Sequence, residues 1–159
     1  MLVSVQDDGK YEINRNGKLY AKFTVKDDEF NGVYEQYYPN GKLKSRIGWK
    51  GEMLHGIHET YYPNGQLEEK GKYNMDVDVG KHEWYFENGQ LKSIFHNDEK
   101  GRLDGKFELY SENGNLLEVR HYKKDKLHGE YTFYKDSGEF WKRRIYRNGN
   151  LIKTMKTPE

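Results

Sequence analysis

Hydrophobic and polar positions alternate along this chain in short runs, and a turn signal separates the runs at almost constant spacing. The signal is Asn-Gly, then one further residue and Leu. It occupies residues 16–19, 40–43, 64–67, 88–91 and 113–116, and it returns in altered form at 137–140. Successive turn glycines lie 24 or 25 residues apart. A fixed period of this length indicates a repeat protein, and stacked repeats favour a binding surface over an active site.

Each repeat is predicted to be one β-hairpin. A second glycine stands nine residues before the turn glycine in five repeats, at Gly32, Gly56, Gly80, Gly105 and Gly129. Asn-Gly between alternating residues is a strong hairpin signal, because a two-residue turn needs positive φ at both positions. We therefore expect a tight Asn-Gly turn in every repeat.

Two further positions are almost constant between repeats, and we expect them to form the buried face. One holds a tyrosine, at Tyr37, Tyr61, Tyr85, Tyr110 and Tyr134. The other holds Leu43, Leu67, Leu91, Leu116 and Phe140. A lone hairpin is barely stable in water, so stacked repeats must bury such positions together.

The period divides the chain into six repeats without a change of composition between them. The predicted repeats cover residues 9–31, 32–55, 56–79, 80–104, 105–128 and 129–152, in a single domain spanning 1–159. The tail at 153–159 is expected to be frayed. The third link, at 77–80, departs from the Leu-x-Gly pattern of its neighbours, and the fourth link is one residue longer.

The composition fits a thin sheet better than a thick core. Only 34% of the residues are hydrophobic, yet 15% are aromatic, whereas disordered chains are poor in aromatic residues. The absence of cysteine excludes disulfides and thiolate metal sites, and it fits a reducing compartment. Residues 1–5 lack the basic and apolar regions of a signal peptide. We therefore expect a cytoplasmic protein.

The segments 32–43 and 56–67 read Gly-x-(Tyr/His)-x-x-Tyr-Tyr-Pro-Asn-Gly-x-Leu, and this motif resembles the variant MORN (membrane occupation and recognition nexus) repeat of bacteria. Chains built almost wholly of this repeat resemble the YwqK-like family, described as antitoxins or immunity proteins beside secreted toxins. The resemblance covers residues 9 to 152. It implies an all-β fold, an elongated, curved, single-layer antiparallel sheet of about six consecutive β-hairpin repeats. It implies no catalytic residues.

No motif for catalysis, metal binding or a cofactor is found in the sequence. The histidines of consecutive repeats, such as His58 and His82, would lie two strands apart, about 9–10 Å. Ligands of one zinc ion lie only about 3–4 Å from each other. We expect these histidines to replace tyrosine as planar side chains, and we expect no metal, no cofactor and no enzyme activity.

Positions that differ between repeats are the candidates for partner binding. Two positions, four and six residues after the first glycine of a repeat, share a face if the strand is regular. The earlier position holds the apolar residues Trp84, Leu109 and Phe133, and the later one holds Tyr38, Tyr62 and Phe86. Either the two positions compensate to keep one face covered, or the C-terminal half carries a hydrophobic patch. Trp141 favours a patch, because charged residues hold its position in three other repeats. Exposed aromatic patches are typical binding hot spots.

Charge is also uneven along the chain. Residues 116–159 hold 11 Lys/Arg against 6 Asp/Glu, and their basic cluster contains Lys142, Arg143, Arg144, Arg147 and Lys153. Such a cluster steers an acidic partner, touches anionic lipid, or protects an edge strand from pairing. No signature of a nucleic-acid-reading fold accompanies it, so nucleic acid is not the expected partner.

Two functional hypotheses remain. The first is a non-catalytic antitoxin or immunity protein of a toxin–antitoxin system that neutralises its cognate toxin by covering the toxin's functional surface. The second is a scaffold or tether at an anionic membrane surface, which would use the basic C-terminal repeats.

Overall fold

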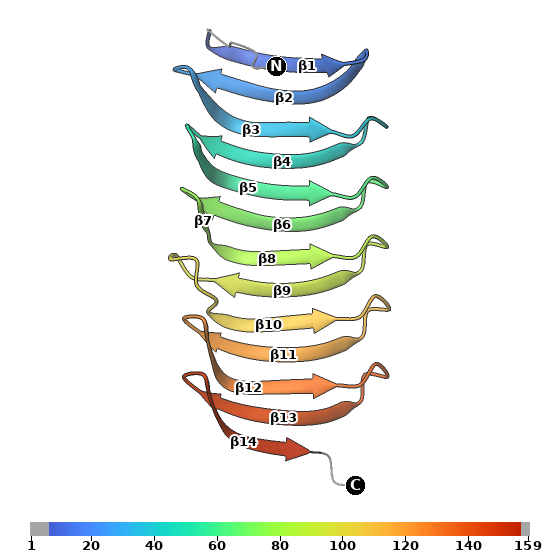
Figure 1. Cartoon of the computed structure of the whole chain (residues 1–159), viewed down its shortest axis with the longest axis vertical. Coiled ribbons are helices and arrows are strands. Elements are labelled where there is room, and N and C mark those ends of the chain that lie inside the picture. The colour runs from blue at the N-terminus through green and yellow to red at the C-terminus, as the bar shows by residue number, and fades with distance from the viewer. Residues whose placement is uncertain (1–6, 157–159) are drawn as a thin grey trace. The chain divides into compact units, whose positions relative to one another are not determined.

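The computed structural model describes residues 7–156, and within this range it contains fourteen β-strands and no helix. Neighbouring strands run antiparallel and follow one another in chain order (Figure 1). The strands are β1 (Gly9–Arg15), β2 (Lys18–Lys26), β3 (Glu29–Tyr37), β4 (Leu43–Lys50), β5 (Met53–Tyr61), β6 (Leu67–Asn74), β7 (Val77–Asp78), β8 (Gly80–Tyr85), β9 (Leu91–Asn97), β10 (Gly105–Tyr110), β11 (Leu116–Lys123), β12 (Lys126–Tyr134), β13 (Phe140–Arg147) and β14 (Asn150–Lys156). The predicted all-β hairpin fold is confirmed.

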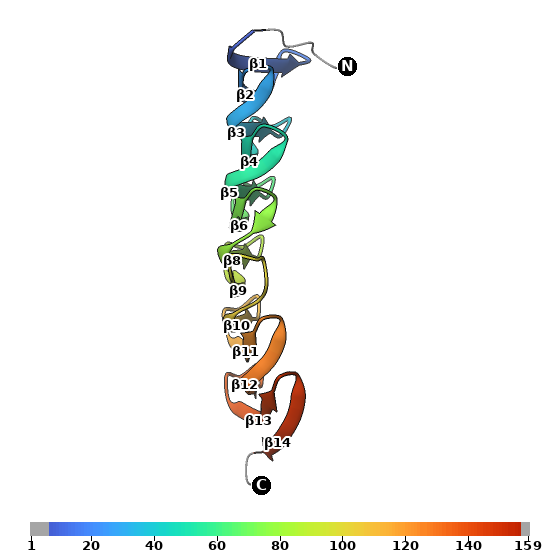
Figure 2. The ribbon, with the colours of Figure 1, turned by 90° about the vertical axis from the view of Figure 1, so that its left-hand side faces the viewer.

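The chain groups into two compact units, Met1–Val77 and Asp78–Glu159, where the sequence predicts one domain. We call them unit 1 and unit 2. Unit 1 contains β1 to β6, and unit 2 contains β8 to β14; Figure 2 shows that each consists of a single layer of strands. The division falls in the link whose sequence departs from the repeat pattern. In repeat proteins each repeat contacts only its neighbours, so an altered link is a natural place for such a division.

The tight Asn-Gly turn is found only in part. In β1–β2 both Asn16 and Gly17 have positive φ, 51° and 74°. In the later hairpins the turn is longer: Gly41 N–H donates to the Tyr38 carbonyl at 2.9 Å, and Tyr38 N–H donates to the Lys42 carbonyl at 2.8 Å. Only the glycine of this turn has positive φ, 83°. Proline is favoured early in a type I turn and glycine at its end, which explains Pro39.

The asparagine of the longer turns serves as a hydrogen-bonding residue. Asn40 Oδ1 accepts from the Lys42 N–H at 3.0 Å, and Asn40 Nδ2 donates to the Pro63 carbonyl of the next turn at 2.9 Å. Asn88 reaches Glu112 in unit 2 in the same way, at 3.0 Å. The turn residue therefore also ties consecutive repeats together.

Two-residue turns with positive φ at both positions occur mainly in the links. They are formed by Asp27 and Asp28, Met75 and Asp76, Lys124 and Asp125, and Asn148 and Gly149. Only the last of these pairs is Asn-Gly. Aspartate tolerates this backbone region because its short side chain bonds locally.

Every full hairpin has a β-bulge near its turn, so one residue of the returning strand has no residue directly opposite it in the ladder. In β3–β4, Gln36 pairs with Ser45 and Tyr37 pairs with Leu43, so Lys44 is extra. The equivalent residues in the other hairpins are Glu68, Lys92, Leu117 and Trp141. A bulge redirects side chains at a strand end. These five bulge residues, which vary between repeats, therefore stand beside the hairpin turns.

Cross-strand rows define two faces of each unit. The aromatic face carries the row Tyr34–Ile47–His58 in unit 1 and the row Phe107–Arg120–Tyr131–Arg144 in unit 2. We call the opposite side the polar face. In unit 1 it carries a charged row that includes Glu35, Arg46, Glu59 and Lys70.

The predicted tyrosine and leucine columns are half-buried rather than buried. A single layer has no second sheet to cover them, so only a few side chains are sealed. Among the described residues the buried hydrophobic ones are Ala21, Phe23 and Val25, all in β2. The Phe23 ring stacks on Tyr11 and Tyr34 with centroids 5.5 and 5.7 Å apart.

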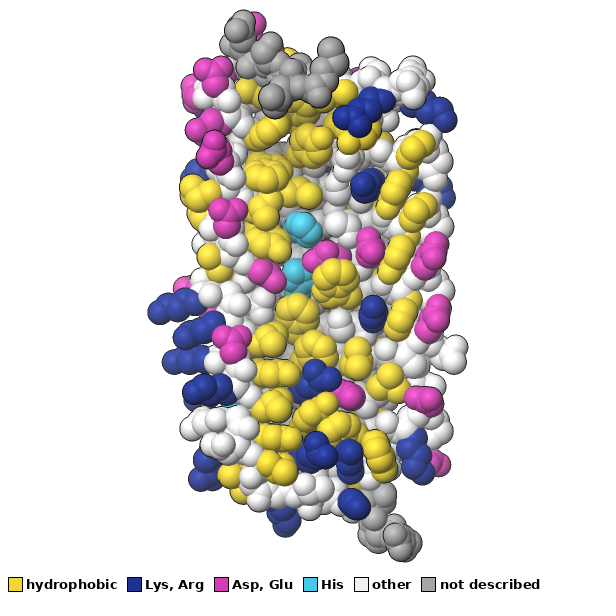
Figure 3. All heavy atoms as spheres, viewed as in Figure 1, with side chains coloured by type: hydrophobic (Ala, Val, Ile, Leu, Met, Phe, Trp, Pro, Cys, Tyr) yellow, Lys and Arg dark blue, Asp and Glu magenta, His cyan; other side chains and the backbone are white. Residues whose placement is uncertain are grey.

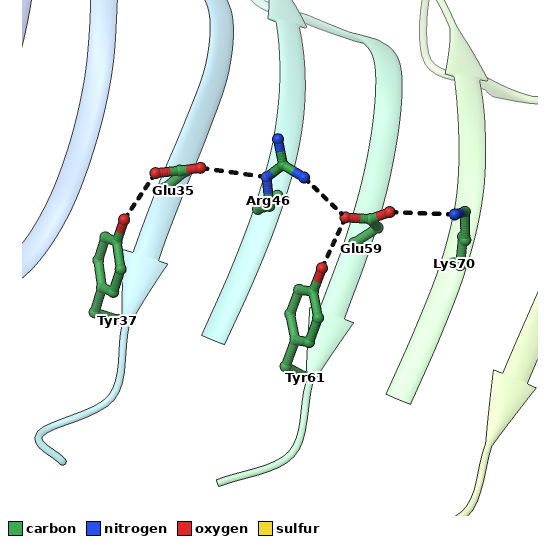
Figure 4. Close-up of polar contacts among 6 residues, drawn as sticks. All are labelled: Glu35, Tyr37, Arg46, Glu59, Tyr61 and Lys70. Carbon is green, nitrogen blue, oxygen red and sulfur yellow. Dashed lines mark hydrogen bonds and ion pairs between the residues drawn. The ribbon is translucent and has the colours of Figure 1, made fainter. Parts of the chain in front are cut away.

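An ion-pair network crosses the polar face of unit 1 (Figure 4). Arg46 lies between Glu35 and Glu59, at 3.2 and 3.4 Å, and Lys70 lies 3.6 Å from Glu59. Tyr37 and Tyr61 donate their hydroxyls to Glu35 and Glu59 at 2.7 and 2.8 Å. Burial opposes the charge of Arg46, but the two carboxylates outweigh it and raise its pKa. Residues of the tyrosine column therefore take part in a polar network through their hydroxyl groups.

The expected fraying of the tail is corrected in part. Residues 153–156 belong to β14, which pairs with β13 along Lys142 to Arg147. The hydrogen bonds of this ladder hold the strand in place. Residues 157–159 lie outside the described range, as do residues 1–5, on which the expectation about a signal peptide rests.

Candidate protein-binding surface

One row of cross-strand partners on the aromatic face of unit 2 brings three of the predicted residues together. The row crosses β8 to β12 through Trp84, Ser93, Leu109, Glu118 and Phe133. The residues of a row stand side by side on one face of a sheet. Trp84, Leu109 and Phe133 are half-buried, so they leave part of their apolar surface accessible.

The aromatic side chains gather most closely at β12 and β13. Tyr131 and Phe133 stack with centroids 4.0 Å apart, and Trp141 meets Phe133 edge to face at 6.3 Å. Trp141 is the bulge residue of its hairpin, and 48% of it is exposed.

Cations lie on these rings. Lys142 Nζ stands 4.5 Å from the Phe133 centroid and 4.0 Å from that of Trp141, and Arg144 lies 5.4 Å from the Phe133 centroid. Within residues 7–156 neither cation has a carboxylate partner, and the buried Nε of Arg144 has no hydrogen-bond acceptor. Cation–π contact holds both in place and leaves their charges for an external anion. Figure 3 shows this face, with Lys and Arg side chains among the hydrophobic ones near β12 and β13.

Arg120 is a neighbouring cation whose charge is already balanced. It bonds Glu118, and its guanidinium lies 4.9 Å from the Phe107 centroid and 5.1 Å from that of Tyr131. Burial disfavours its charge, but the hydrogen bond to Glu118 outweighs burial and raises the pKa of Arg120. Burial and the hydrogen bond from its hydroxyl to Glu118 raise the pKa of Tyr131 to about 12.

We use the name aromatic–basic surface for Tyr131, Phe133, Trp141, Lys142 and Arg144. Sequence reasoning missed the contribution of Tyr131 and the supporting role of Arg120. A signal was present: the position held by Ile47 and Phe95 in earlier repeats is Arg120 and Arg144 in the last two. The arginines bring charge onto the aromatic face in the last two repeats.

The structure separates the other two predicted cations from this surface. Arg143 pairs across the ladder with Thr132 and Met155, so it lies on the polar face, where it bonds Glu130 at 3.1 Å. Arg147 is exposed at the end of β13, opposite Asn150. Adjacent strand residues point to opposite faces, which divides the basic cluster.

Tyr38, Tyr62 and Phe86 occupy equivalent places in the longer turns. Each begins its turn by accepting a hydrogen bond at its carbonyl from the turn glycine. Tyr38 belongs to unit 1, where its hydroxyl donates to the Tyr61 carbonyl at 2.7 Å; Tyr62 also belongs to unit 1. Phe86 belongs to unit 2, with Lys92 Nζ 5.6 Å from its centroid. The three rings therefore line the turn edges rather than the aromatic–basic surface.

The histidines have partners of their own in each unit. His58 packs against Tyr73 at 5.2 Å and lies 3.6 Å from Glu69. His82 is almost fully buried, stacks on Phe95 at 5.1 Å, and bonds Asp78 at 2.8 Å. No group of three or more His, Cys, Asp or Glu side chains within residues 7–156 is placed to hold a metal ion. No helix in this range is long and apolar enough to cross a membrane.

Comparison with protein families places the repeats in a known class. Residues 30–50, 54–75, 78–96 and 103–124, together more than half of the chain, match the family described as MORN repeat variant. A comparison with curated proteins finds no match. Repeats of this family form a binding module that is, in general, non-catalytic.

Proposed function

Because the chain belongs to the MORN repeat variant family, we propose that it is a non-catalytic module that binds a partner protein through the aromatic–basic surface of unit 2. The partner presents carboxylates around an apolar centre. One observation carries this proposal: Lys142 and Arg144 lie on the Phe133 and Trp141 rings without a carboxylate partner in the described range.

The chemistry of the surface suits a protein partner. Interface hot spots are enriched in Trp, Tyr and Arg and tend to lie in well-packed, desolvated centres. Trp141 supplies an exposed anchor on a rigid strand. Lys142 and Arg144 add orientation and faster association through charge complementarity.

We further propose that this partner is a toxin and that the chain is its antitoxin or immunity protein. The resemblance to YwqK-like chains supports this role. Neutralisation by occlusion needs a firm surface and a few anchors, and it needs no catalytic group. The ladders of β12, β13 and β14 provide the firm surface.

Co-expression with the products of adjacent genes tests the proposal. We expect one product to co-elute in size-exclusion chromatography and to inhibit growth unless this chain is present. Trp141→Ala should weaken the complex while circular dichroism stays unchanged. Met53→Ala, an exposed hydrophobic residue of unit 1, is the control and should bind normally. Free elution without growth rescue for every neighbour would overturn the toxin proposal.

A second candidate is attachment to an anionic membrane surface. The exposed Leu151 and Ile152 of β14, at 52% and 59%, stand beside Lys153. Basic side chains attract anionic lipid headgroups, and apolar side chains beside them can enter the boundary between headgroups and acyl chains. Flotation with phosphatidylserine vesicles, compared with phosphatidylcholine vesicles, decides between the candidates. Salt-sensitive flotation with phosphatidylserine alone would favour the tether.

A further inference from the structure

Unit 1 contains a hollow at the turn end of its aromatic face, remote in sequence from the aromatic–basic surface. Its volume is about 450 Å³, and its lining includes Arg15, Lys18, Tyr20, Gln36, Tyr38 and Lys44. Sites for small molecules have volumes of roughly 300–1,000 Å³. The hollow therefore has the size of a ligand site.

The charges in this hollow are all positive. Its lining includes three cations, Arg15, Lys18 and Lys44, and no carboxylate. Lys18 donates to the Pro39 carbonyl at 2.8 Å, while Arg15 and Lys44 have no carboxylate partner in the described part of the chain. An uncompensated group of cations in a hollow favours an anion.

Aromatic contacts position two of these cations. The Arg15 guanidinium lies 3.6 Å from the Tyr20 centroid, and Lys44 Nζ lies 5.9 Å from that of Tyr38. Gln36 Nε2 donates to the Tyr20 hydroxyl at 2.6 Å. Because that hydroxyl accepts from Gln36, its own proton is directed to another acceptor. Tyr20 and Arg15 can therefore both donate to one bound anion.

A second hollow adjoins the first at Gln36, which lines both. It has a volume of about 340 Å³, and its other lining residues are Phe30, Tyr34, Ser45, Ile47 and Trp49. Most of these are apolar or aromatic. The two hollows together offer a cationic end and an apolar end on one face.

The two hairpins that line the first hollow differ in their turns. The β1–β2 hairpin turns in two residues, Asn16 and Gly17, whereas the β3–β4 turn occupies residues 38–42. In β1–β2 the cation, Arg15, precedes the turn and the aromatic residue, Tyr20, follows it. In β3–β4 the aromatic residue, Tyr38, comes first and the cation, Lys44, follows.

We propose that these hollows bind a carboxylate attached to a flat apolar group, with the carboxylate between Arg15, Lys44 and the Tyr20 hydroxyl, and the apolar group in the second hollow against Tyr34, Ile47 and Trp49. Such a group occurs in free aromatic acids and in a peptide that ends in an aromatic residue. The proposal does not depend on a partner at the aromatic–basic surface.

Binding of 2-naphthoate to the full chain, followed by NMR and isothermal titration calorimetry, tests this site. We expect saturable shifts at Arg15, Tyr20 and the Trp49 indole. The neutral isostere 2-naphthamide should bind about tenfold more weakly, because it lacks the charge-assisted hydrogen bonds. A blocked peptide ending in tryptophan, with a free or an amidated C-terminus, distinguishes the two sources of the carboxylate. Tighter binding of the free-acid peptide would point to a protein terminus, whereas binding of 2-naphthoate alone would point to a free acid.

Variants locate the carboxylate. Arg15→Gln with Lys44→Gln, both on the surface, should weaken 2-naphthoate about tenfold and leave 2-naphthamide unchanged. The control is Lys92→Gln, because Lys92 stands on Phe86 as Lys44 stands on Tyr38. Equal affinity for the acid and the amide, or equal loss in the control, would overturn the proposal. So would the absence of saturable shifts.

Discussion

Asp76 and Leu54 form a reciprocal pair of hydrogen bonds between consecutive links. The Asp76 carboxylate accepts from the Leu54 N–H at 2.8 Å, and the Asp76 N–H donates to the Leu54 carbonyl at 3.0 Å. Asp125 and Leu103 repeat the arrangement in unit 2, with both distances 2.9 Å. One side chain thus fixes a turn with positive φ and joins it to the preceding repeat.

Replacement of Asp125 tests this reciprocal pair of hydrogen bonds. Asp125→Ala removes the acceptor and places alanine at φ 67°, so we expect the free energy of unfolding to fall by about 1–3 kcal/mol. Asp125→Asn keeps an acceptor and tolerates this conformation, and should cost under about half as much. Urea denaturation measures both. Equal losses in the two variants would show that the side-chain hydrogen bond contributes little.

Gly48 is required by a close backbone approach. A Cβ at this position would lie 2.1 Å from the His55 carbonyl oxygen, and backbone atoms cannot move aside cheaply. We expect Gly48→Ala to destabilise the protein by about 1–3 kcal/mol or more. Gly9→Ala is the matched control, because a Cβ there meets only a Tyr11 ring carbon at 3.8 Å. Thermal unfolding that is equal for the two variants would contradict this account of the β4–β5 contact.

The Arg46 network should contribute more to the free energy of unfolding than an exposed ion pair does. Arg46→Gln leaves Glu59, which is 7% exposed, without its nearer cation. We expect a loss of about 1–3 kcal/mol, below the value for fully buried pairs because Arg46 is partly exposed. Lys22→Gln breaks the exposed pair with Glu12 and should cost about 0–1 kcal/mol. Chemical denaturation of both variants checks the difference, and a loss for Lys22→Gln as large as that for Arg46→Gln would refute it.

The Tyr37 hydroxyl should lose its proton at a higher pH than an ordinary tyrosine does. Burial, with the hydrogen bond to Glu35, raises its pKa from 10.0 to about 12. Between these pH values the unfolded chain releases the phenol proton and the folded chain keeps it, so this contribution to stability is present below pH 10 and is lost by about pH 12. A titration with 13C-labelled tyrosine should give a midpoint near 12 for Tyr37 and a lower midpoint in Glu35→Gln. An ordinary midpoint in the unmodified protein would contradict the hydrogen bond.

The hairpin architecture was predictable because the period, the turn glycines and the alternation all point to it. The turn types were not. Asn-Gly is expected to form two-residue turns, and Asn16–Gly17 and Asn148–Gly149 do so. In the longer turns Asn40 acts through its side chain instead, and Asp-Asp forms a tight link turn at residues 27–28. Asparagine and aspartate fit both roles, so a single sequence does not separate them.

The candidate surface was predictable only in its apolar part. Parity along the strands gave Trp84, Leu109 and Phe133, which share one cross-strand row. In the sequence the basic cluster is one continuous feature, yet alternation places Arg143 on the polar face. The importance of Lys142 and Arg144 arises from contacts with rings on a neighbouring strand or at the bulge, and such contacts depend on the register.

Two double variants with the same change in charge test most directly whether the aromatic–basic surface binds the partner. Lys142→Gln with Arg144→Gln removes the cations of that surface, and Arg143→Gln with Arg147→Gln removes two cations away from it. Each is measured by calorimetric titration against the partner recovered by co-expression. We predict a loss of affinity of about tenfold or more for the first pair and a change of under about threefold for the second. The reverse order, or equal losses, would contradict the assignment of the aromatic–basic surface as the binding site.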